Sequence, residues 1–226
     1  MTDVAATTPT PALLNHTSLS GPRHRYILLL LLGAYTLSFL DRQVVTILAE
    51  AIKKDLDISN LELGMLTGLA FAVFYTFLGI PIARLAERRS RPHIIAISMA
   101  LWSGFTVLSG RATSFAVMGL ARLGVGFGEA GCNPCAHSMI ADITPPEKRA
   151  SALAFYSLGV PIGTMLGLVL GGVIADAYGW RVAFMVAGAP GLVLAAIIAL
   201  TVKEPRSQLA ADIKVRAQSM PSFQAQ

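Results

Sequence analysis

The chain has 226 residues, of which 54% are hydrophobic and only 14% are charged, and its mean hydropathy is +0.61. Soluble domains carry about 25% charged residues, so this composition excludes soluble and disordered proteins and indicates an integral membrane protein. The net charge of +5 is accounted for by the excess of basic residues in the cytoplasmic loops of membrane proteins, and no nucleic-acid partner is predicted.

Six apolar runs approach the length of about 20 residues that a helix needs to cross a bilayer. In chain order they cover 26–48, 63–83, 94–108, 113–141, 150–174 and 182–202. The chain is therefore predicted to be an all-α, multi-pass membrane protein with a bundle over 26–202. Residues 1–25 are predicted to form a disordered cytoplasmic tail, and 203–226 a cytoplasmic tail or a linker.

The basic residues of the loops and tails divide unequally between the two sides of the membrane. An even number of spans places both termini on one side, and cytoplasmic segments carry the excess of Lys and Arg. Both termini are therefore predicted to be cytoplasmic, in an inner or plasma membrane. The richer side holds Arg23, Arg25, Arg84, Arg88, Arg89, Arg91, Lys148, Arg149, Lys203, Arg206, Lys214 and Arg216, and the other side holds Lys53, Lys54, Arg111 and Arg181.

Four charged side chains fall inside the apolar spans: Asp41, Arg42, Arg122 and Glu129. Each costs roughly 2.5 to 3.5 kcal/mol at the centre of a bilayer, so such groups pair or have a function. Because the first span runs outward and the fourth inward, Asp41 and Arg122 are predicted to meet. Asp41 and Glu129 are the predicted proton carriers, whereas Arg122 and Arg42 are assigned to binding an anionic substrate.

The polar residues of the fourth span lie on one helical face. Arg122, Gly126, Glu129, Asn133 and His137 are separated by three or four residues. This face cannot contact lipid, and Asn133 and His137 are assigned to substrate binding beside Arg122. When Glu129 is charged, it is expected to balance Arg122 along the helix. The alternative is a polar seam that only joins helices.

Cys132 and Cys135 form a Cys-x-x-Cys pair within the fourth span. One such pair with a single nearby histidine is a weak metal signal, so these residues are predicted to pack as small apolar side chains. Neither a metal nor another cofactor is predicted. The Asn133-Pro134 step is expected to kink the helix, which serves either gating or shape.

Four glycines repeat at every fourth position of the fifth span: Gly159, Gly163, Gly167 and Gly171. Such a repeat lets another helix backbone approach closely, so helix packing is favoured over a sliding contact. Tyr35 and Tyr156 either line a path or lie in the core.

The loop after the second span resembles a motif of the major facilitator superfamily. Residues 83–91, ARLAERRSR, are similar to G-x-L-A-D-R-x-G-R, with Ala83 and Ser90 in place of glycines and Glu87 in place of aspartate. Arg122-x-x-x-Gly126-x-Gly128-x-Ala130 matches the helix 4 motif R-x-x-x-G-x-G-x-A in full. The resemblance implies a fold in which two inverted three-helix repeats form one six-helix half.

Within this superfamily, Phe39-Leu40-Asp41-Arg42 and Gly128-Glu129-Ala130 resemble the spinster branch. Members of that branch move lysolipids and sphingolipid-like amphiphiles, but an Asp-Arg pair in helix 1 also occurs in organic anion symporters. The resemblance covers about 25–205 and only the first half of the twelve-helix family. A fragment of a longer transporter is favoured over a half-size protein that pairs with a second six-helix unit.

The resemblance and the buried charges together predict a secondary transporter that works by alternating access. It would use protons to move an anionic or amphipathic solute, with the lipid bilayer and a second six-helix half as partners. Glu87, Arg88 and Arg91 are predicted to form a cytoplasmic gate. An enzyme is not predicted, since no phosphate-binding loop or Ser/His/Asp set is present. The alternatives are an organic anion symporter and a non-transporting scaffold or receptor.

Overall fold

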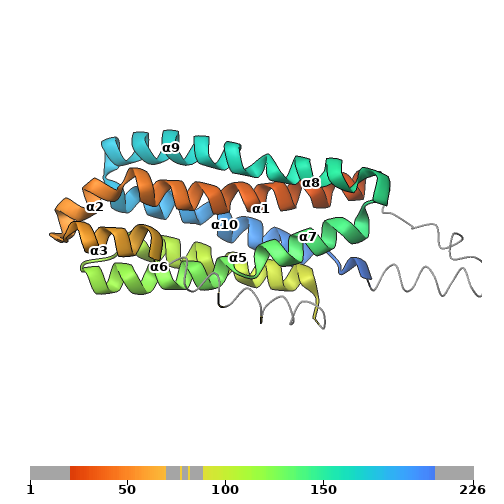
Figure 1. Cartoon of the computed structure of the whole chain (residues 1–226), viewed down its shortest axis with the longest axis horizontal. Helices are drawn as coiled ribbons and strands as arrows, with labels where there is room; N and C mark the ends of the chain where they lie inside the picture. The colour runs from red at the N-terminus through yellow and green to blue at the C-terminus, as the bar shows by residue number, and fades with distance from the viewer. Residues whose placement is uncertain (1–20, 70–76, 78–80, 82–88, 207–226) are drawn as a thin grey trace, which may run out of the picture.

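The computed structural model describes residues 21–69, 77, 81 and 89–206, and helices dominate these residues (Figure 1). The predicted all-α fold is confirmed. In chain order the elements are α1 (Pro22–Ile47), α2 (Ala49–Leu56), α3 (Asn60–Gly64), the π-helical turn η2 (Met65–Leu69), α5 (Arg91–Ser109), α6 (Phe115–Glu129), α7 (Cys132–Ile143), the 3₁₀ turn η3 (Pro146–Lys148), α8 (Arg149–Ser157), α9 (Gly159–Tyr178) and α10 (Trp180–Thr201).

Four helical stretches among the described residues are long and apolar enough to cross a membrane. They are Pro22–Ile47, Arg91–Ser109, Pro146–Tyr178 and Trp180–Thr201. α1 begins before the predicted span because Pro22 occupies the start of the helix, where its missing N–H costs no hydrogen bond. Most of the second predicted span lies outside the described residues, as do residues 1–20 of the predicted tail 1–25 and residues 207–226 of the predicted tail 203–226.

The fourth and fifth predicted spans are each divided into two helices. α6 ends at Glu129 and α7 begins at Cys132, so the break lies one turn before Pro134. A proline ring collides with the carbonyl four residues earlier, which here belongs to Ala130. In the same way α8 ends at Ser157, four residues before Pro161. In both cases the helix breaks N-terminal to the proline, so the kink expected at Asn133-Pro134 lies slightly earlier in the chain.

The long helices pack in two main pairs. α1 lies along α9, and α5 lies along α10, while contacts between α1 and α10 join the pairs (Figure 1). α6 packs on the other side of α5. This arrangement places α1 among α9, α10 and the elements that carry the buried charges.

The glycines of α9 form the surface that packs on α1. Gly159, Gly163, Gly167 and Gly171 are all buried. A Cβ at Gly163 would overlap the backbone carbonyl oxygen of Thr36 in α1, so a larger residue there requires the helices to separate.

Gly163→Ala should reduce the thermal stability of the chain, because the added methyl meets backbone rather than a movable side chain. Overpacking of this kind costs about 1 to 3 kcal/mol. Gly172→Ala is the matched control, since a Cβ at Gly172 meets no atom within 4 Å. Thermal unfolding in detergent measures both, and equal midpoints for the two variants would contradict the close packing.

Candidate functional site

Asp41 and Arg122 form an ion pair inside the bundle. Asp41 is 2% exposed and Arg122 is 4% exposed. The Arg122 Nη1 donates to Asp41 Oδ2 at 3.2 Å, and the Thr106 hydroxyl of α5 donates to Asp41 Oδ1 at 2.6 Å. The contact that the sequence predicts between Asp41 and Arg122 is present. Thr106 was not identified from the sequence, because a single threonine in an apolar span carries no distinguishing pattern.

Arg42 and Glu129 form a second pair beside the first. The Arg42 Nη2 and Nε donate to Glu129 Oε2 at 2.6 Å and 2.9 Å. The Glu129 side chain is 1% exposed, whereas that of Arg42 is 30% exposed. The Arg42 guanidinium also lies over the Phe39 ring, at 5.0 Å from its centroid. One side of Arg42 is therefore held in the bundle while another part reaches its surface.

This pairing corrects the expectation that Glu129 balances Arg122. The two residues are seven positions apart on one helix, which is about 10 Å of rise, so direct contact is unfavourable. Asp41 and Arg42 are adjacent on α1 and are rotated by about 100° from each other, and they pair with residues at different levels of α6. Each charge is consequently balanced between helices and not along α6.

Several polar atoms of this cluster have no hydrogen-bond partner among the described residues. They are Arg122 Nε and Nη2 and Glu129 Oε1. The Arg122 guanidinium instead lies against the Phe184 ring, 5.5 Å from its centroid. Since buried donors without partners are costly, Arg122 retains hydrogen-bonding capacity that a water molecule or an anionic group can use.

An aromatic cluster lies at the start of α7. Tyr35 and Tyr156 stack with centroids 4.4 Å apart, and His137 meets the Tyr156 ring edge to face at 5.4 Å. The Tyr156 hydroxyl donates to Asn133 Oδ1 at 2.7 Å. Asn133 and His137 thus contact Tyr156 of α8, while Arg122 and Arg42 belong to the ion pairs. The structure brings the predicted substrate-binding residues into two adjacent groups.

Arg91 occupies the first turn of α5 and is fully buried. Its Nη1 lies 2.7 Å from Asp142 Oδ2 and donates to Ser138 Oγ at 2.8 Å, both on α7. Its Nη2 donates to Glu204 Oε1 at 2.6 Å, just beyond α10. Arg91 therefore joins three helices at one end of the bundle. Glu87 and Arg88, the other predicted gate residues, lie outside the described residues.

Arg206 extends this end network. Its Nε donates to Asp142 Oδ2 at 3.2 Å and its Nη2 to Ser138 Oγ at 3.1 Å. Burial by itself would raise the pKa of Glu204, but hydrogen bonds from the Arg91 side chain and backbone outweigh it and lower that pKa below its usual value. The Glu204 carboxylate contributes stability above its unfolded-state pKa, and the contribution is lost as the pH falls through the lowered, folded-state pKa.

Cys132 and Cys135 are free and buried within a hydrophobic cluster that includes Trp102 and Ile140. Their position agrees with the predicted packing role. Within the described ranges, no group of three or more His, Cys, Asp or Glu side chains is placed to hold a metal ion.

The apolar helices and the charges paired between them define a multi-pass integral membrane protein. The sequence profile described as Major Facilitator Superfamily matches residues 31–224, so the chain belongs to this superfamily. The expected fold is thereby confirmed.

The chain is similar in sequence to several transporters. It is 36% identical over 204 residues to an MFS-type efflux pump of Mycolicibacterium smegmatis, covering 89% of this chain and 47% of the pump. It is 29% identical over 168 residues to a probable L-galactonate transporter of Escherichia coli, covering 74% and 37% of the two chains.

A crystal structure of a bacterial homologue of the human lysosomal transporter Spinster, inward-facing and unoccupied, superposes with a TM-score of 0.78. The identity is 39%, with 82% of this chain and 44% of that chain covered. The expected resemblance to the spinster branch is confirmed. The chain spans less than half the length of each of these relatives.

The pairing of the buried charges can be measured with double-mutant cycles on thermal stability. Arg42→Gln with Glu129→Gln, and Asp41→Asn with Arg122→Gln, should each show a coupling energy of roughly 0.5 to 3 kcal/mol, as expected for residues in contact. Arg122→Gln with Glu129→Gln is the control cycle and should show the smallest coupling. If this last cycle has the largest coupling, the charges are balanced along α6 and the observed pairing is wrong.

Arg91→Ala should expose the core next to α7, because removal of one partner from a buried charge network costs about 3 to 5 kcal/mol. In a Cys132→Ala background, the remaining thiol of Cys135 serves as the reporter. Its labelling by a maleimide should accelerate at least about tenfold, which corresponds to only 1.4 kcal/mol. Arg89→Ala, at an exposed position in the same segment, should leave the rate unchanged. Equal rates for the two variants would show that Arg91 does not hold this end closed.

Proposed function

We propose that the chain forms one six-helix half of a proton-coupled secondary transporter that works by alternating access. The observation that carries this proposal is the pair of ion pairs between α1 and α6, with buried carboxylates facing two arginines. Ionisable groups inside membrane spans mark ion and substrate pathways. A second six-helix half, on the same or another chain, would complete the transporter.

Glu129 is the proposed proton-coupling residue. Its carboxylate pairs with Arg42, whose side chain is 30% exposed while that of Glu129 is 1% exposed. Protonation of Glu129 removes the charge that holds Arg42 inward, so the guanidinium can turn toward an anionic group of the solute. Proton uptake and solute binding would then favour each other, because each stabilises the same state of Arg42.

Asp41 and Arg122 have different roles in this scheme. Arg122 is the proposed anion-binding residue, since its Nε and Nη2 have no partner among the described residues and its planar fork suits a carboxylate or phosphate. Asp41 is the second proposed proton-coupling residue. Because it connects α1 with Thr106 of α5 and Arg122 of α6, its protonation and deprotonation would alternately loosen and tighten three helices during the conformational switch, a cycle that a permanently neutral side chain cannot complete.

An anionic amphiphile, such as a lysolipid or a sphingolipid-like molecule, is the proposed solute. The two arginines suit its head group, and the stacked Tyr35 and Tyr156 with His137 offer an aromatic surface to its apolar part. The similarity to the spinster homologue supports this class. A small organic anion is the second candidate, which the likeness to a probable L-galactonate transporter favours. Comparing lysolipids with sugar acids as stabilising ligands separates the two.

The proposed orientation places both termini in the cytoplasm. The ends of α1, α5, α8 and α10 that carry Arg25, Arg91, Arg149 and Lys203 lie at one end of the bundle (Figure 1). Basic residues concentrate on the cytoplasmic side. The Arg91 network would then close the cytoplasmic side, and it would form the gate together with Glu87 and Arg88.

Glu129→Gln should retain solute binding and exchange but lose accumulation driven by a pH gradient, because glutamine mimics the protonated carboxyl. For one proton per solute, a difference of one pH unit drives about tenfold accumulation, and the variant should fall to about onefold. The measurement is uptake and binding against pH in proteoliposomes of a protein that contains both halves.

The controls for this experiment separate coupling from folding. Glu50→Gln, at an exposed position in α2, should keep normal accumulation, and Arg122→Ala should abolish binding of the anionic solute. Asp41→Asn should slow exchange more than it weakens binding. Normal gradient-driven accumulation by Glu129→Gln would exclude Glu129 as the coupling residue and leave the polar face of α6 and α7 as a packing surface.

A further inference from the structure

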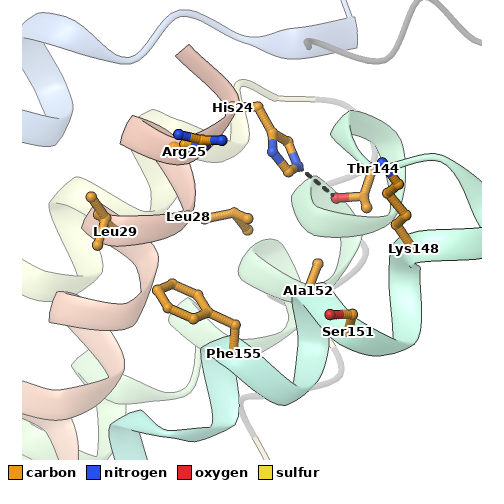
Figure 2. A pocket seen from close by; sticks show the side chains of 9 residues that line it. All are labelled: His24, Arg25, Leu28, Leu29, Thr144, Lys148, Ser151, Ala152 and Phe155. Carbon is orange, nitrogen blue, oxygen red and sulfur yellow. Dashed lines mark hydrogen bonds between the residues drawn. The ribbon is translucent and has the colours of Figure 1, made fainter. Parts of the chain in front are cut away.

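A cavity of about 430 Å³ lies between the first turn of α1 and the start of α8 (Figure 2), and none of the four residues that form the ion pairs between α1 and α6 lines it. Its polar rim consists of His24, Arg25, Thr144, Lys148 and Ser151. His24 Nε2 lies 3.0 Å from Thr144 Oγ1, a hydrogen bond that connects α1 to the end of α7. The rim therefore combines cationic side chains with hydroxyl groups at one end of the bundle.

The charge of this rim is unbalanced. Arg25 and Lys148 are exposed and approach the cavity from different segments (Figure 2). Among the described residues, no carboxylate forms an ion pair with either of them. Two cations with nearby hydroxyl donors suit the oxygens of a phosphate group. At the end of a membrane helix, the phosphate within reach is that of a lipid head group.

The floor of the cavity is apolar, and a second, apolar hollow adjoins it at Leu29. Leu28 and Phe155 lie beneath the polar rim. Leu29 lines the cavity and also lines a second hollow of about 590 Å³ between α1, α9 and α10. That hollow is walled mainly by apolar side chains, including Val193 and Ile197. A cationic pocket followed by an apolar groove matches a phosphate head group followed by an acyl chain.

We propose that the rim and the groove together bind one anionic diacyl phospholipid of the surrounding bilayer. Arg25 and Lys148 hold the phosphate, the exposed Ser151 hydroxyl contacts one of its oxygens, and an acyl chain runs past Leu29 into the groove. The bound lipid would join α1 to α8, α9 and α10. This site is separate from the proposed solute pathway, and its test requires no transport activity.

The head-group part is tested by thermal unfolding of this chain in detergent with added dioleoyl phosphatidylglycerol or dioleoyl phosphatidylcholine. Phosphatidylglycerol should raise the midpoint of the unmodified chain, and phosphatidylcholine should not. In Arg25→Ala/Lys148→Ala the apparent affinity for phosphatidylglycerol should fall about thirtyfold. Lys54→Ala/Arg111→Ala removes two exposed cations elsewhere and should leave it unchanged. No effect of phosphatidylglycerol, or equal losses in both double variants, would overturn the proposal.

The acyl-chain part is tested by filling the groove. Val193→Trp, at a 62% exposed position in the groove, should weaken phosphatidylglycerol binding. Leu200→Trp, at an 85% exposed position outside it, is the matched control and should not. Soluble glycerol phosphate should stabilise far less than the lipid at equal concentration. If it stabilises equally, or if Val193→Trp has no effect, the cavity is an anion site without an acyl groove and the proposal fails.

Discussion

Burial of opposite charges between α1 and α6 is the constraint on which the arrangement of the bundle depends. A charge without a partner in an apolar span is costly, so the four ionisable groups must meet when the helices pack. Asp41 and Arg42 are neighbours on α1, whereas Arg122 and Glu129 are two turns apart on α6. Both pairs form together at the rotation and depth that α1 adopts in this structure. The pairs therefore fix the register of these helices.

The two sides of α1 contact their neighbours in opposite ways. Toward α5 and α6 the contact is specific, because the hydrogen bond from Thr106 of α5 and the ion pairs with α6 are lost when the helix moves by one residue. Toward α9 the contact is made by glycines such as Gly163, which present a smooth groove without directional bonds. A change in charge on the side with the ion pairs can therefore shift the position of α1 without disrupting its close packing on α9.

The sequence was sufficient to identify the kinds of residues at the site but not their partners. Asp41, Arg42, Arg122 and Glu129 stand out because charges are rare in apolar spans. Helical periodicity relates residues on one helix and says nothing about how one helix is rotated against another, which is why periodicity predicts the wrong partner for Glu129. Two other residues of these networks cannot be identified from the sequence. Thr106 is an isolated threonine in an apolar span, and Glu204 follows the last span, where acidic residues are common.

The break between α6 and α7 connects the site to the end of the bundle. Glu129 is the last residue of α6, and Ala130 and Gly131 separate it from α7. α7 in turn carries Asn133 beside the aromatic cluster and Asp142 in the Arg91 network. Because Pro134 removes a backbone hydrogen bond at this joint, α7 can tilt against α6 at lower cost than a continuous helix could bend.

A proton taken up by Glu129 would loosen the ion pair directly beside the joint. The resulting tilt of α7 would act on the contacts of Asp142, so the proposed coupling residue and the proposed gate are connected by one rigid helix.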